Sequence, residues 1–235
     1  KASGAVELND NFLLLDFSTN TINNDGENIE FFGTLAGPGG MIYAGDGVAT
    51  LSGAAAYEGA TVGEAGTLSL KASSATFDVA SSSVDVKGGA ALQLEAPSSD
   101  SAAFSVNSLS LQSGSKLNKV GSWASLFVQK DGLATQGNVT IDVAVPDGRN
   151  PQIENGLHIN ASAWSGDGTI TKEGRGVLAI GCERNSESEC SAIGFTGETS
   201  YDYAGTINVE QGNLALYRAS LPAASIDVSS ESVLE

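Results

Sequence analysis

The feature that most constrains the fold is a two-residue alternation of apolar and polar residues in many short segments. Most of these segments are three to five residues long, and Gly, Ser, Asn or Asp separates them. This period is typical of β-strands that bury one face. No apolar stripe with a 3.6-residue period is long enough for a helix. The sequence therefore predicts an all-β chain, with strands at 68–70, 77–79, 84–86, 92–94, 104–106, 109–111, 139–145, 157–159, 207–209, 214–216 and 226–228.

Short strands with Gly-rich corners suit a sandwich, an antiparallel barrel or a β-solenoid. The composition favours the solenoid, because hydrophobic residues reach 41% while aromatic residues are only 6% and Gly numbers 29. Sandwiches prefer longer strands around a bulky aromatic centre, whereas solenoid corners need residues that accept positive φ. At about 20 to 25 residues per turn, the chain would make roughly ten turns and span on the order of 50 Å.

Two segments, 45–70 and 164–216, share an internal repeat. Tyr57, Gly59, Gly66, Leu68 and Leu70 reappear at a fixed offset, and the Gly-Asp-Gly at 45–47 has a counterpart at 166–168. The later copies are Tyr203, Gly205, Gly212, Leu214 and Leu216. We expect residues 1–235 to form a single β-helix segment of a longer protein.

The charge balance excludes several classes of partner. With 11 Lys and Arg against 28 Asp and Glu, the net charge is −17. A polyanion repels phosphate backbones and anionic membrane surfaces, so we expect no nucleic-acid partner. No run approaches the roughly 20 apolar residues of a membrane helix, so we expect a chain that is not itself embedded in the membrane.

The sequence offers little for catalysis. His158 is the only histidine, and alternation places it opposite two aliphatic residues, on the predicted outer face. Asp85, Asp142 and Asp227 are also expected to face outward, without any sign that two of them form a glycosidase pair. We expect no catalytic site, no metal and no cofactor. A carbohydrate-active β-helix enzyme remains an alternative.

Two cysteines and a few loop residues stand out. Cys182 and Cys190 lack the further ligands that a zinc site needs, which leaves a local disulfide or two free thiols. The loop 147–155, which contains Arg149, the cysteine loop, and the aromatic residues Trp164 and Tyr201 are the candidate contact surface.

The repeat segments resemble the β-strand repeat of autotransporter passenger regions. Residues 166–180 match its Gly-x-Gly, Thr-Lys-x-Gly-x-Gly and aliphatic strand, and residues 203–216 match its Tyr-x-Gly, Thr-containing strand and Gly-x-Leu-x-Leu end. The insertion at 182–202 and the lack of a Thr-Lys half in 45–70 depart from that pattern. The resemblance covers about a quarter of the chain well.

The resemblance implies a right-handed parallel β-helix with protruding loops. It also implies export through the periplasm and across the outer membrane by a C-terminal β-barrel translocator, which, like a signal peptide, lies outside these 235 residues. The expected role at the cell surface or in secreted form is adhesion or self-association, with a host surface or another copy as partner. A passive stalk for a functional head is the alternative.

Overall fold

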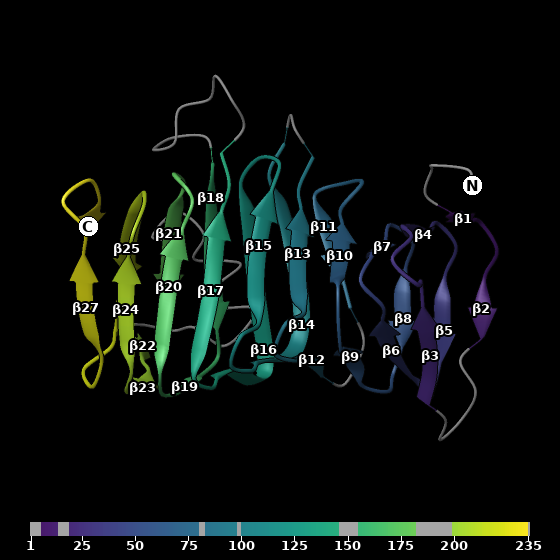
Figure 1. The fold of residues 1–235 in the computed structure, drawn as a ribbon, viewed down its shortest axis with the longest axis horizontal. Coiled ribbons are helices and arrows are strands. Elements are labelled where there is room, and N and C mark those ends of the chain that lie inside the picture. The colour runs from purple at the N-terminus through teal and green to yellow at the C-terminus, as the bar shows by residue number, and fades with distance from the viewer. Residues whose placement is uncertain are drawn as a thin grey trace.

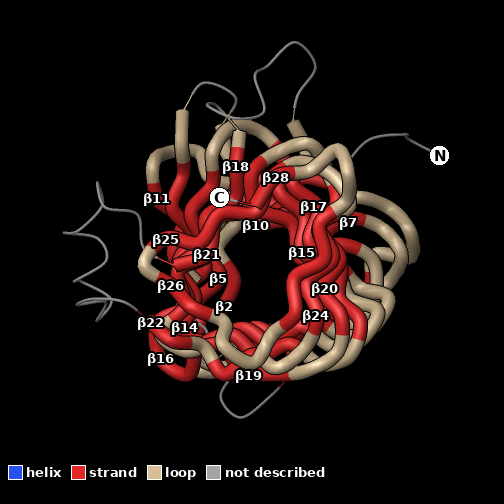
Figure 2. The backbone as a smooth tube through the Cα atoms, turned by 90° about the vertical axis from the view of Figure 1, so that its left-hand side faces the viewer, coloured by secondary structure: helices blue, strands red, loops and turns tan. Residues whose placement is uncertain are grey.

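The chain folds as a right-handed parallel β-helix, as the resemblance implied. The structure is a computed structural model that describes residues 6–13, 19–79, 83–97, 100–145, 155–181 and 199–234. All strand pairs in these ranges are parallel, and the described residues contain no helix. Figure 1 shows the strands stacked along one axis, and Figure 2, which looks along that axis, shows them around a common centre.

Each turn of the rod contributes up to three short strands, so the rod has three faces. Face one is a ten-stranded sheet, which at about 4.8 Å per step is about 40 Å long. Its strands are β1 (Val6–Leu8), β4 (Ile29–Phe31), β7 (Val48–Leu51), β10 (Thr67–Lys71), β13 (Ala91–Glu95), β15 (Lys116–Val120), β17 (Asn138–Val143), β20 (Thr169–Glu173), β24 (Thr206–Val209) and β27 (Ser225–Val228).

Within a turn, faces two and three follow face one, although the turns that begin at β24 and β27 have no described face-three strand. Face two consists of β2 (Phe12–Leu13), β5 (Leu35–Gly37), β8 (Ala55–Tyr57), β11 (Thr76–Asp78), β18 (Gly156–Ala161), β21 (Val177–Gly181), β25 (Asn213–Tyr217) and β28 (Val233–Leu234). Face three consists of β3 (Thr19–Asn23), β6 (Gly40–Ala44), β9 (Thr61–Gly63), β12 (Val84–Val86), β19 (Trp164–Gly166) and β23 (Asp202–Tyr203).

Two long strands, β14 (Ala102–Leu111) and β16 (Ala124–Thr135), bend across faces two and three. Their first halves pair with face-two strands and their second halves with face-three strands. At the bend the register shifts, because Val106 is paired with Val128 but Ser108 with Gly132. The residues 129–131 of β16 are therefore an exposed bulge between the two faces. A separate small pair, β22 (Thr199–Ser200) with β26 (Ala219–Ser220), completes the strands.

The length of a turn matches the expectation through most of the rod. One turn takes 24 residues from Thr67 to its partner Ala91, and 25 from Ala91 to Lys116. Two turns are longer, with 31 residues from Asn138 to Thr169 and 37 from Thr169 to Thr206. Their additional residues include 146–154 and 182–198, which lie outside the described residues.

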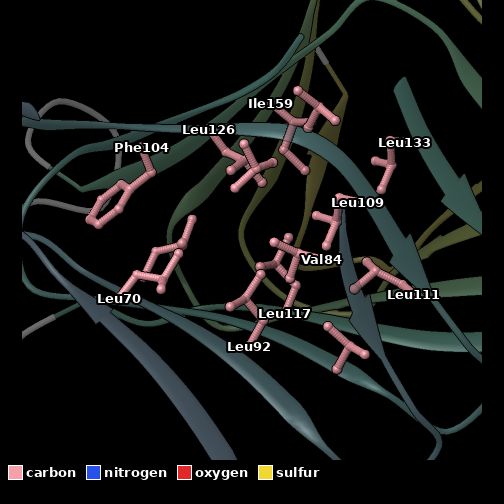
Figure 3. Packing of buried hydrophobic residues seen from close by; sticks show 14 of the residues in the cluster. Leu70, Val84, Leu92, Phe104, Leu109, Leu111, Leu117, Leu126, Leu133 and Ile159 are labelled. Atoms are coloured by element: carbon pink, nitrogen blue, oxygen red, sulfur yellow. The ribbon is translucent and has the colours of Figure 1, made fainter. Parts of the chain in front are cut away.

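Stacked aliphatic rows fill the interior. On face one Leu68, Leu92, Leu117 and Ile141 lie in register, and each is at most 2% exposed. Figure 3 shows such residues from all three faces pointing toward one another. Because each side chain contacts its equivalent in the next turn, burial stabilises every turn through its neighbours. Alternation predicted these inward positions correctly.

The two repeat segments do not occupy equivalent places. Leu68 and Leu70 belong to β10 on face one, whereas their counterparts Leu214 and Leu216 belong to β25 on face two. Tyr57 ends β8 on face two, and its counterpart Tyr203 lies in β23 on face three. The Tyr and Leu positions of the second copy are therefore shifted by one face around the rod, whereas the Gly-Asp-Gly segment lies between face three and face one in both copies.

Candidate functional site: a neutral polar face on an acidic rod

Two of the predicted contact residues are not at the surface. Trp164 and Tyr201 are each 1% exposed, and their rings are in edge contact with centroids 6.0 Å apart. The Trp164 Nε1 donates to Oγ1 of Thr135 (3.2 Å), and the Tyr201 hydroxyl donates to the carbonyl of Ala161 (3.1 Å). Their place in the contact surface was therefore wrong: both side chains point into the core, where these bonds satisfy their polar atoms.

The other predicted loop residues cannot be placed. Arg149, Cys182 and Cys190 lie outside the described residues, so the contact role of Arg149 and the disulfide stay predictions.

His158 is not at the surface, although its direction was predicted correctly. Its neighbours Leu157 and Ile159 join the core, and His158 points the other way. It is nevertheless only 3% exposed, because a second layer covers the outside of β18. Its ring is in edge contact with Tyr217, with centroids 5.7 Å apart, beside a small cluster of Val177, Ala179 and Ala215. A side chain buried in this layer is not accessible to a substrate.

Burial makes His158 an acid-sensitive position. Desolvation lowers the pKa of its imidazole from 6.5 to about 4, and a backbone hydrogen bond with Gly181 only partly opposes this shift. The imidazole of His158 is therefore protonated below about pH 6.5 in the unfolded chain, but only below about pH 4 in the folded chain. The stability that depends on neutral His158 is complete above pH 6.5 and is lost as the pH falls through this window.

We expect this one side chain to make the unfolding free energy fall by about 2 kcal/mol between pH 7.5 and pH 5.0. Urea unfolding of the wild type and of His158→Gln at both pH values measures the difference, since the variant lacks this contribution. Because the chain has a single histidine, one imidazole proton signal reports its titration by NMR. A midpoint near 6.5 in the folded protein would contradict the assignment.

Two buried lysines were missed in the sequence. Lys119 and Lys172 are both 0% exposed and occupy inward positions at the ends of β15 and β20. The Lys172 Nζ donates to the carbonyls of Glu173 (2.9 Å), Gly174 (2.6 Å) and Gln211 (2.8 Å). The Lys119 Nζ donates to the carbonyls of Gly121 (2.8 Å) and Ala144 (3.3 Å). Both ammonium groups thus join the corner of their own turn to the corner of the next.

The lysines act as corner ties rather than as nucleophiles. Desolvation lowers the pKa of each ammonium to about 8, and for Lys172 the nearby Asp142 opposes that shift. Both remain charged at pH 7 and both donate to backbone carbonyls. The sequence contains a pattern that could have identified these lysines. Each lies two residues after an inward apolar residue and two residues before a Gly. Those glycines, Gly121 and Gly174, have φ of 80° and 75°, which favours glycine at the corner.

Among the described residues, the acidic side chains do not gather into a site. No group of three His, Cys, Asp or Glu lies close enough to hold a metal ion there. Asp85 and Asp142 are half-buried and Asp227 is exposed, all on outward positions as predicted. Asp85 is paired with Lys87 and also accepts from Nε2 of Gln112 (3.3 Å).

The outer side of face one carries two rows of mostly polar residues across five adjacent strands, β7, β10, β13, β15 and β17. We call this surface the neutral face. Gln93 donates to Oγ of Ser69 (3.3 Å), so neighbouring rungs of the ladder are connected. The rows are Thr50, Ser69, Gln93, Asn118 and Asp142, and beside them Val48, Thr67, Ala91, Lys116 and Thr140. Ser69 and Ala91 are buried at their outward positions, whereas the other members of the two rows are half-buried or exposed.

The charges of the neutral face cancel. The outward charged residues of these five strands are Lys71, Lys116, Glu95 and Asp142, two of each sign. Lys71 is 4.0 Å from Glu95 and 3.0 Å from Glu30, which lies in β4, two strands away and outside the five strands of the neutral face. In a chain of net charge −17, this surface is one where a second acidic molecule can approach without meeting an excess of like charge.

Comparison with known proteins found no matching family model, no matching curated protein and no matching solved structure. Among the residues that the structure describes, there is no helix with the length and apolar character needed to span a bilayer.

Proposed function

We propose that this chain is an adhesive rod that associates with further copies of itself through the neutral face. The observation that carries the proposal is the cancellation of charge on β7 to β17 in a strongly acidic chain. Hydroxyl and amide groups there can both donate and accept hydrogen bonds, so one copy of the face can serve as partner for another.

The size of the neutral face sets the strength of the contact. Five strands at about 4.8 Å and five residues at about 3.3 Å give roughly 400 Å² per copy. Stable pairs bury about 800 Å² per partner, so a single contact between two rods is weak. Many rods held on one surface add such contacts together and gain in effective concentration. The expected behaviour is a monomer in dilute solution and clumping where the rods are displayed densely.

The setting we propose follows the resemblance of residues 166–180 and 203–216. The rod would be a passenger segment of an autotransporter, exported through the periplasm and held at the cell surface, or released from it, after passage through its own C-terminal barrel. It would carry no catalytic activity of its own. The side chains of His158, Lys119 and Lys172 are buried, so a substrate could not reach them.

The test displays the chain on a non-clumping bacterium, fused to a translocator, and follows settling of the culture. We expect rapid settling that soluble chain inhibits, and none with Gln93→Glu combined with Asn118→Glu, because two extra carboxylates per copy face each other in the contact. The matched control is Gln129→Glu with Gln211→Glu, which adds the same charge at exposed positions off face one and should settle like the wild type.

Two outcomes would overturn the proposal. Unchanged settling, with display confirmed by antibody, would favour a passive stalk. Equal loss of settling in both double variants would show that total charge matters and the neutral face does not.

A further inference from the structure

A hollow of about 470 Å³ lies on the outer side of face three, over β12, β14 and β16. Asp85, Ser110 and Ala134 are register partners in these three strands and form its floor. The exposed bulge at Asp131 bounds one side, and Gln112 and Gln136 bound the other. The volume lies in the range of small-molecule sites, and the hollow is on a different face from the neutral face.

The lining is rich in groups that bind hydroxyls. Gln112 and Gln136 each offer an amide donor and an amide acceptor, Ser110 offers a hydroxyl, and Asp131 offers two acceptor oxygens. None of the described lining residues is aromatic, so hydrogen bonds rather than ring stacking would hold a ligand there.

The charge of the hollow excludes two other kinds of ligand. The described lining residues include two carboxylates and no basic side chain, which disfavours an anion. A divalent cation is also disfavoured. Asp85 is paired with Lys87, and Asp131 is the other carboxylate among the described lining residues, whereas Ca²⁺ takes six to eight oxygen ligands. A neutral molecule with many hydroxyls fits both the charge and the mixture of donors and acceptors.

We propose that this hollow binds a neutral oligosaccharide. Its floor spans three strands, about 10 Å along the rod, which accommodates about two sugar units. The expected contacts are paired hydroxyls on Asp131 and on the amides of Gln112 and Gln136. The binding is weak for one hollow, and the site is independent of whether the rods associate with each other.

The experiment uses the isotope-labelled chain and follows the side-chain amide signals of Gln112 and Gln136 by NMR. The probes are cellotetraose, maltotetraose and mannotetraose, with a heparin tetrasaccharide and calcium chloride as contrasts. We expect saturable shifts of both amides with at least one neutral probe, and none with the heparin fragment.

Two matched variants test the location. Ser110→Phe fills the floor of the hollow and should weaken binding at least tenfold. Ser165→Phe makes the same change in the same outward row, one strand beyond the hollow, and should bind as the wild type does. Circular dichroism confirms that both variants remain folded.

Three results would overturn the proposal. They are no shift with any neutral probe up to about 20 mM, shifts with calcium chloride alone, or equal affinity of wild type and a folded Ser110→Phe. The second result would identify a cation site instead.

Discussion

Lys172→Met is expected to lower the unfolding free energy by about 4 kcal/mol, the larger effect among the lysine substitutions. The Nζ of Lys172 donates to three carbonyls, of which Gln211 belongs to the next turn. Methionine fills similar volume but leaves those acceptors buried without their donor. Replacing a buried ion pair by apolar residues is often tolerated, but here the partners are neutral backbone groups that the substitution cannot remove.

The unfolding free energies of three lysine variants are expected to fall in a fixed order. Lys119→Met removes two donations rather than three and should cost about 3 kcal/mol, while Lys116→Met at an exposed position of β15 should stay within about 0.5 kcal/mol. Urea unfolding followed by circular dichroism gives all three values. If Lys172→Met proved as stable as the wild type, the cost of burying the ammonium would equal the value of its three bonds, and the corner-tie role would fail.

Trp164→Ala is expected to cost about 4 kcal/mol, because it opens a large cavity inside the rod. The ring of Trp164 lies against both Tyr201 and Tyr203, with centroid distances of 6.0 and 5.8 Å. Trp164→Phe keeps an aromatic ring but loses the bond from Nε1 to Thr135, so a smaller loss of about 2 kcal/mol is expected. Thermal and urea unfolding, with the exposed neighbour variant Ser165→Ala as control, measure the losses.

The Trp164→Ala variant also distinguishes a structural role of this residue from a role in binding a partner. Since the side chain is 1% exposed, Trp164→Ala should leave settling of displayed cells unchanged at temperatures where the variant is folded. Loss of settling in a variant that is shown to be folded would mean that this residue reaches a partner, and its assignment to the core would be wrong.

The sequence by itself determined the local geometry. Alternation in segments such as 92–94 and 109–111 specified strands and the side chains that point inward, because successive residues of a strand point to opposite sides. Scarce aromatic residues, frequent Gly and a turn of 20 to 25 residues specified a solenoid, and the absence of helical periodicity agreed with the described residues. The neutral face was also encoded, as mostly polar residues at the outward positions of five strands.

Only the tertiary structure decided what lies over each outward residue and on which face each segment falls. Alternation placed His158 outward but carried no information on the second layer around Tyr217, which comes from a different turn. It did not show that Trp164 and Tyr201 point inward, since turn residues flank both in the sequence. The number of residues at each corner moved the Leu214 repeat to another face than the Leu68 repeat. The hollow over β12, β14 and β16 likewise depends on a register shift between strands that are distant in the chain, and such shifts arise from packing between turns.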